Sequence, residues 1–336
     1  MRIKLFTIIL LVVFLISACG QPTAPVATAT PINTAIPTPT LIPTASTPLA
    51  ILVVPLGMEQ ATSDLYQKTV NELAQQSGFR FQVRNTLTPT DIADPTLKVV
   101  IAIPPDPGIA TLAPTAPGVQ FLAVDIPNLK AGGNVSVLAP NTQVELPAFL
   151  AGYVAAMITE EYRIGMLIPQ GDPDAQRALA AFNNGMIYYC GLCRTFLYYR
   201  ITAPDYLEIP AAEEATRYSG YANVMINDHD IDTLYIYPAL AKEEFLSDVG
   251  TTGAMLIGTH MPEPRPGGWV MTIEPNTIKA IQLAWPDLIA GKGGVEVQSP
   301  LGLGDVDPTL LTPGRLRLAQ ETLDGLLAGR ISPTSP

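Results

Sequence analysis

The chain has little of what metal, redox or nucleic-acid chemistry requires. Its 336 residues include three cysteines and two histidines, and only 15% are charged. Acidic residues outnumber basic ones by 30 to 19 and no cluster of lysine and arginine occurs, so nucleic acid is not an expected partner. Removal of residues 1–18 would take away Arg2 and Lys4 and change the net charge from −11 to −13. This acidity also opposes electrostatic attraction to anionic lipid headgroups.

The chain also lacks a long apolar run that could span a membrane. The N-terminal run Leu5–Leu15, broken only by Thr7, is shorter than the roughly 20 residues a spanning helix needs. A charged start precedes it and small residues follow it, which is the organisation of a secretory signal. We therefore predict a signal peptide at residues 1–18, with an uncut signal anchor as the alternative.

The four residues Ile16–Cys19 resemble the lipobox of bacterial lipoproteins. This resemblance implies that the chain is cut before Cys19 and that the Cys19 thiol carries lipid. Two or more acyl chains give stable anchoring, whereas one gives only marginal binding. The expected location is therefore extracytoplasmic, lipid-anchored to the outer face of the cell membrane.

A tether is expected between the lipid and the folded body, over residues 19–49. The stretch Gln21–Ala50 contains seven prolines and eight threonines, with no charged or aromatic residue. Such a composition favours an extended, semi-rigid chain rather than a packed domain.

The two remaining cysteines, Cys190 and Cys193, are separated by Gly-Leu. We favour a small disulfide, because the chain is expected outside the cytoplasm. A zinc site that recruits His229 and His260 is one alternative, although neither histidine has zinc-finger spacing. A thioredoxin-like redox pair is another, although the motif follows a helix-like stretch rather than a strand. No metal and no cofactor are expected.

The body alternates short apolar runs with helix-like segments. The expected strands cover 51–56, 79–83, 99–103, 119–124, 135–138, 163–168, 196–201, 233–237, 255–258 and 269–273. The expected helices cover 62–76, 145–159, 174–189, 211–227, 241–248, 276–290 and 315–328. Strands that are apolar on both faces indicate parallel sheets covered on both sides. Because about ten such units are too many for one compact sheet, we predict an α/β fold with two doubly wound parallel-sheet lobes.

Several short motifs occur in a fixed order over nearly the whole body: Phe121–Asp125, Asn134-Val135, Phe149–Gly152, Ile164-Gly165, Phe182, Gly185, Ile231–Leu234 and Leu256–Gly258. Their order resembles that of the BMP family, also called PnrA-like, of lipid-anchored solute-binding proteins of ABC transporters.

This resemblance implies the type I periplasmic-binding fold, in which two lobes are joined by a hinge of three crossovers. The first lobe would comprise 50–137 plus about 268–291, and the second 138–267 plus about 292–330. Several members of the family bind purine nucleosides. Here the loop Gly57–Gln60 lacks the family's aspartate pair, whereas Asp125 keeps its polar ligand position.

Ligands of doubly wound sheets bind beyond the carboxyl ends of the strands, so the residues there are the candidate site. Carboxylates can hold ribose hydroxyls and aromatic rings can stack on a base or sugar. For each candidate the alternative is a solvated loop residue or a helix cap. The candidates are Met58, Glu59, Asp106, Asp125, Gln170, Asp172, Tyr237, Thr259, His260 and, at an expected crossover, Trp269.

The resulting functional hypothesis is a monomeric binding component of an ABC importer. It would capture a small polar ligand, with nucleosides as candidates, in the cleft between lobes and present it to a permease. A second hypothesis is a degenerate binding fold that acts as a sensor or surface interaction module. A surface hydrolase is the third, and we expect no enzyme, because Gly-x-Ser-x-Gly, His-Glu-x-x-His and Walker motifs are all missing.

Overall fold

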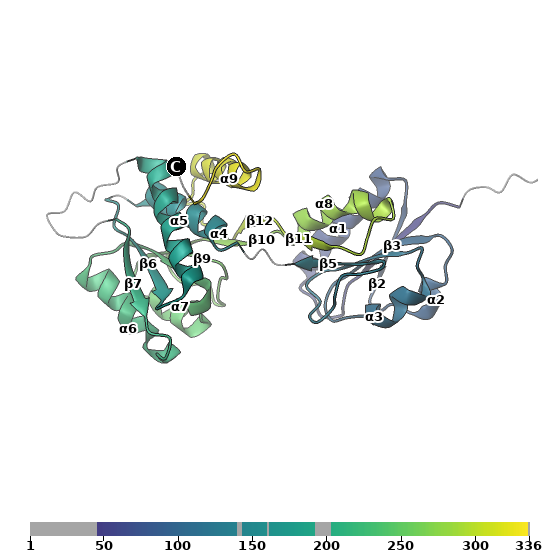
Figure 1. Ribbon diagram of the computed structural model, residues 1–336, viewed down its shortest axis with the longest axis horizontal. Helices are drawn as coiled ribbons and strands as arrows, with labels where there is room; N and C mark the ends of the chain where they lie inside the picture. The colour runs from purple at the N-terminus through teal and green to yellow at the C-terminus, as the bar shows by residue number, and fades with distance from the viewer. Residues whose placement is uncertain (1–45, 140–142, 160, 192–202, 335–336) are drawn as a thin grey trace, which may run out of the picture. The chain divides into compact units, whose positions relative to one another are not determined.

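The computed structural model describes residues 46–139, 143–159, 161–191 and 203–334 (Figure 1). The predicted signal peptide, Cys19, almost all of the tether, Cys193 and the strand expected over 196–201 lie outside these residues. Within the described ranges, no helix combines the length and apolarity needed to cross a membrane.

The first lobe is built on a parallel sheet with the strand order β11-β5-β4-β3-β1-β2. Its strands are β1 (Leu49–Val53), β2 (Arg80–Arg84), β3 (Leu97–Ala102), β4 (Gln120–Ala123), β5 (Val135–Ala139) and β11 (Glu296–Gln298). Its helices are α1 (Gln60–Gln76), α2 (Pro89–Ile92), α3 (Ile109–Leu112) and α8 (Thr277–Ile289).

Both faces of this sheet are buried, as the continuous apolar runs predict. Ala50 and Leu52 of β1 pack into a core with α1 and α8, whereas Ile51 and Val53 pack into the core on the opposite face. Every residue of β1 is buried. A strand buried on both faces gains nothing from alternating polar residues, which explains why these segments read as unbroken apolar runs.

The second lobe is built on a sheet with the order β12-β10-β9-β8-β6-β7, in which only β12 is antiparallel to its neighbour. Its strands are β6 (Ile164–Pro169), β7 (Asp205–Ile209), β8 (Thr233–Ile236), β9 (Met255–Gly258), β10 (Trp269–Pro275) and β12 (Leu301–Gly304). Its helices are α4 (Glu145–Ile158), α5 (Pro173–Cys190), α6 (Tyr218–Asn223), α7 (Glu243–Gly250) and α9 (Pro313–Leu327).

The chain passes from one sheet to the other three times: from β5 to α4, from β10 to α8, and from β11 to β12. In each sheet the first five strands follow the doubly wound order 2-1-3-4-5. Two such sheets linked by three crossovers confirm the predicted two-lobed, type I periplasmic-binding fold.

The structure differs from the sequence prediction in several places. The elements β7, β11, β12, α2 and α3 were not predicted, and two predicted elements differ from expectation. Strand β10 was expected in the first lobe but lies in the second sheet, because it pairs with β9 and β12; β11 lies in the first sheet. The helix expected over 211–227 is instead a 3₁₀ turn at Ala215–Arg217, then α6, then a π-helical turn at Val224–Asp228.

Helices α4 and α5 cross with their backbones in contact. A Cβ added at Gly152 of α4 would overlap the carbonyl group of Phe182, and one added at Gly185 of α5 would overlap that of Phe149. The two contacts are reciprocal, and α4 is buried along almost its whole length. The glycines of the family-like motifs are therefore required by helix packing.

We expect Gly152→Ala and Gly185→Ala each to lower the free energy of unfolding by about 1–3 kcal/mol, because a fixed backbone carbonyl occupies the space of the new methyl group. Urea denaturation measures this. Gly220→Ala is the matched control, since nothing lies within 4 Å of its Cβ position in α6. That change should be neutral or stabilising by up to about 1 kcal/mol. Equal effects at the three sites would contradict the packing argument.

Candidate functional site

At the carboxyl edge of the first sheet, the structure brings together the loops that carry four predicted site residues. Met58 and Glu59 follow β1, Asp106 follows β3 and Asp125 follows β4, and these three strands are adjacent. Met58 packs against the core beneath α1 and α8.

Two of these carboxylates already have local partners. Asp106 accepts hydrogen bonds from the backbone N–H groups of Gly108 and Ile109, at 3.0 and 2.8 Å, where α3 begins. Glu59 accepts a 2.7 Å hydrogen bond from the Thr62 hydroxyl. Asp106 and Glu59 are therefore a helix-capping residue and a loop residue in this structure, which was the alternative to a ligand contact.

Asp125 differs from them. Its backbone has a positive φ of 51°, and its carboxylate makes neither a hydrogen bond nor an ion pair with any residue of the described ranges. Partial burial raises the pKa of Asp125 above its ordinary value. Asp125 is solvent-exposed, so its carboxylate needs no protein partner and its oxygen atoms are accessible to a ligand. Its positive φ is one that aspartate adopts more readily than most residues.

Two residues near this edge, Tyr66 and Thr277, were missed by the sequence analysis. Burial, and then the charge of Asp125, raise the pKa of Tyr66 on α1, beside which lies Thr277 at the start of α8. Neither residue follows a strand, so the rule based on strand ends could not find them. Tyr66 thus lies within electrostatic range of Asp125.

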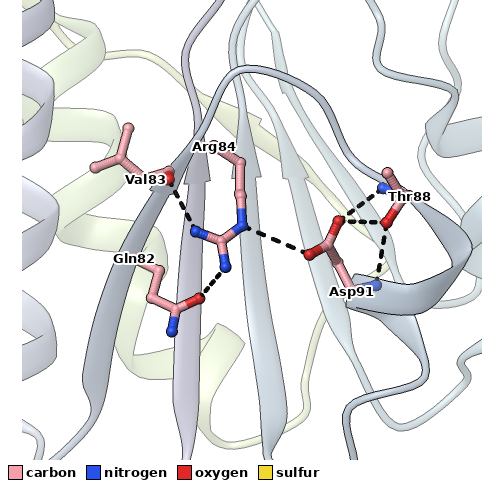
Figure 2. Close-up of polar contacts among 5 residues, drawn as sticks. All are labelled: Gln82, Val83, Arg84, Thr88 and Asp91. Atoms are coloured by element: carbon pink, nitrogen blue, oxygen red, sulfur yellow. Dashed lines mark hydrogen bonds and ion pairs between the residues drawn. The ribbon is translucent and has the colours of Figure 1, made fainter.

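One cation of this edge, Arg84, already has partners (Figure 2). Arg84, at the end of β2, forms an ion pair with Asp91 at 3.5 Å and donates to the Gln82 side chain and the Val83 carbonyl. Asp91 also forms a reciprocal capping box with Thr88 at the start of α2. Hydrogen bonding from Thr88, and then Arg84, holds the pKa of Asp91 below its ordinary value.

The carboxyl edge of the second sheet likewise gathers five predicted residues. Gln170 and Asp172 follow β6, Tyr237 follows β8, and Thr259 and His260 follow β9, which are again adjacent strands. Asp172 caps α5 through one carboxylate oxygen, which accepts from the N–H groups of Asp174 and Ala175. Gln170 is exposed, and its N–H donates to the Ile209 carbonyl.

Tyr237 is the most buried of these candidates, with 6% of its surface exposed. Burial, and then the nearby charges of Asp172 and Asp174, raise its pKa to about 12. Beside it, Arg177 forms 2.6 Å ion pairs with both Glu145 and Asp174. The sequence analysis missed Glu145 and Arg177, because both lie on helices.

His260 belongs to a second group of charges on this edge. Its Nε2 atom lies 3.7 Å from the Glu243 carboxylate. Burial, and then the charge of Asp305, raise the pKa of Glu274, whereas His260 opposes that change. Asp305 accepts a 2.6 Å hydrogen bond from Thr272.

Trp269 is placed differently from the prediction. It begins β10, so it lies at the amino end of that strand and not at the crossover that follows Pro275. Only 1% of its surface is exposed, and its indole N–H donates to Thr272. Here Trp269 is a core residue rather than a ligand contact.

The described part of the Cys-Gly-Leu-Cys motif is consistent with a disulfide. Cys190 is disulfide-bonded, while its predicted partner Cys193 lies outside the described residues, so the pairing stays a prediction. A bonded sulfur is not available as a zinc ligand, and His229 instead contacts Asp205 at 2.5 Å.

No family model matches this sequence, and no curated protein matches it. Among solved structures, an ABC transporter solute-binding protein from Conexibacter woesei is 15% identical, with a TM-score of 0.46, over 85% of this chain and 98% of its own. An ABC transporter solute-binding protein from Aeropyrum pernix is 16% identical, with a TM-score of 0.41, over 85% and 92%. A transcriptional activator of the comK gene from Bacillus halodurans is 11% identical, with a TM-score of 0.46, over 83% and 96%. At these values the similarity identifies no ligand, and the fold assignment rests on strand order and crossovers.

We expect Asp125→Asn to leave the unliganded protein at least as stable as the wild type at pH 7, because the exposed carboxylate makes no hydrogen bond or ion pair with the described residues. The folded-state pKa is raised, so protonation favours the folded state, and the wild type should gain stability over the variant as pH falls. Urea denaturation at several pH values measures this. Asparagine tolerates positive φ, which keeps the comparison clean. Asp172→Ala, which removes a helix cap, should instead cost about 1 kcal/mol. A clear loss of stability in Asp125→Asn would give Asp125 a structural role.

Proposed function

We propose that this chain is the extracytoplasmic solute-binding component of an ABC importer, held to the membrane by lipid on Cys19. It captures a small polar ligand, with nucleosides among the candidates, on residues at the carboxyl edges of its two sheets. One observation carries the proposal. In each of two doubly wound sheets, polar side chains gather where ligands of such sheets bind, and one of them, Asp125, is exposed there without a hydrogen bond or ion pair to the described residues.

The three crossovers support this proposal, because they are short connections at which hinge closure can take place. The backbone runs from β10 into α8 through Asn276, which caps the helix by accepting from the Lys279 N–H at 2.8 Å. Closure over a ligand would create the form that a permease recognises. A lipid and a proline-rich tether would keep that form beside the membrane.

A sensor or surface interaction module is the second candidate. It is favoured by the loop Gly57–Gln60, which lacks the aspartate pair expected from the family resemblance. The two candidates differ in whether a small ligand stabilises the protein.

The first test is a thermal-shift screen of the full chain with nucleosides, sugars, amino acids and amines. A ligand present at one hundred times its Kd should stabilise the folded form by about 2.7 kcal/mol, because it binds that form alone. Asp125→Asn should weaken a ligand found this way by about tenfold, or about 1.4 kcal/mol. If no compound raises the Tm, the binding-protein proposal fails and the interaction module is favoured.

The anchor is tested separately. Cys19→Ser should move the protein from the membrane fraction to the soluble fraction, since no acyl chain can then be attached. Fractionation with immunoblotting measures this, and metabolic labelling with a fatty acid should mark the wild type only. Cys190→Ser is the control and should stay in the membrane fraction. Membrane retention of Cys19→Ser would show that residues 1–18 form an uncut anchor.

A further inference from the structure

A cavity of about 1040 Å³ lies beside α8, β12 and α9. Residues of all three crossovers line it: Gln143 precedes α4, Asn276 precedes α8, and Ser299 and Pro300 join β11 to β12. None of the predicted site residues is among those that line it. Ligand pockets usually enclose about 300–1,000 Å³, so this cavity has room for a ligand of its own.

The apolar part of the cavity wall is aliphatic. Leu283 of α8 and Leu327 of α9 are 55% and 40% exposed, although both are large apolar side chains. Single exposed leucines are ordinary, but several that line one cavity mark a surface that something covers. None of the described residues of the wall is aromatic, so an aliphatic ligand fits better than a stacked ring. The leucines of the wall are Leu146, Leu283, Leu301, Leu303, Leu326 and Leu327.

Two cations border the same cavity. Lys279 on α8 and Arg330 beyond the end of α9 are exposed, and neither side chain forms an ion pair or a hydrogen bond with a described residue. The acid of the wall, Asp324, instead accepts a 3.0 Å hydrogen bond from Gln320. In a chain with a net charge of −11, this cavity therefore has a local excess of positive charge. The complementary ligand is an anion.

We propose that this cavity binds a single-chain aliphatic acid, such as a medium-chain fatty acid. Its carboxylate would be held by Lys279 and Arg330, since hydrogen bonds between ionised partners are stronger than neutral ones. Its chain would cover the leucines, whose contact with water is unfavourable. A small anion would leave the leucines exposed, and a neutral chain would leave both cations without a counter-charge.

This site goes beyond the proposed function and does not depend on it. The ligand of the proposed importer component lies at the strand ends, whereas this cavity is lined by the crossovers and by α8, β12 and α9. The two sites share none of the predicted residues, so each can be tested without the other.

Compounds with the same chain and different head groups test the charge. We would titrate the full chain by calorimetry with decanoate, decanol and decylamine, each below the concentration at which it forms aggregates. Decanoate should bind at least about tenfold more tightly than the other two, because only its head group complements the two cations. Hexanoate should bind at least about tenfold more weakly than decanoate, because four fewer methylene groups leave water.

Variants then locate the site. Lys279→Gln and Arg330→Gln should each weaken decanoate by about tenfold and leave the binding of decanol unchanged. Lys292→Gln is the matched control, because it removes the same charge from an exposed position beyond α8 that does not line the cavity. Leu283→Gln should weaken decanoate and decanol alike. Its control is Ile289→Gln, which changes another exposed apolar residue of α8 outside the wall.

The outcomes distinguish this inference from its alternatives. Decanol or decylamine that binds as tightly as decanoate would overturn it, and so would decanoate binding that Lys279→Gln and Arg330→Gln both leave intact. Tighter binding of a short-chain phosphatidylglycerol than of decanoate would assign the cavity to a phospholipid and overturn the proposal of a free acid. Failure of decanoate to bind would overturn the inference and leave the binding-protein proposal standing.

Discussion

The close crossing of α4 and α5 is the contact on which the second lobe depends. Gly152 and Gly185 each lie against a carbonyl of the other helix, so the two axes approach as closely as backbone atoms allow. This contact buries α4 in the core on one face of the second sheet, where the rings of Tyr235 from β8 and Phe182 from α5 stack. Exposing so apolar a helix to water would be unfavourable, so α4 must be packed against the rest of the lobe. This packing determines the position of its first residue.

That first residue is Glu145, which explains how a packing contact deep in the lobe reaches the candidate site. Glu145 is the first residue of α4 and Arg177 the fifth of α5, and their ion pair joins the N-terminal ends of the two helices. Arg177 also holds Asp174, next to the cap of α5. The glycine crossing, the ion pair and the cap together fix the charges around Tyr237. The family-like motifs around Gly152 and Gly185 are therefore explained by helix packing in this lobe and do not identify a ligand.

The fold could be predicted well from the sequence because most of its strands are buried on both faces. The strands β1, β3 and β6 show no alternation of polar and apolar residues. The order of such strands along the chain predicts two parallel sheets. Strands β11 and β12 were missed because they are short and, in β12, alternate glycine with leucine. Trp269 was misplaced because its position along β10 depends on the register with β9, which composition does not encode.

The candidate site was predictable only in part, because a carboxylate at a strand end can do either of two things. Asp106 and Asp172 bind backbone N–H groups and begin helices, so their presence follows from local chain geometry. Asp125 occupies the same kind of position, yet begins no helix and keeps its oxygens free. Sequence position cannot distinguish these two uses, since both need an acid after a buried strand. What separates them is the hydrogen-bond inventory of each oxygen atom. Asp125 is solvent-exposed and makes no hydrogen bond within the described residues, so its oxygen atoms are the ones at this edge that are available to a ligand.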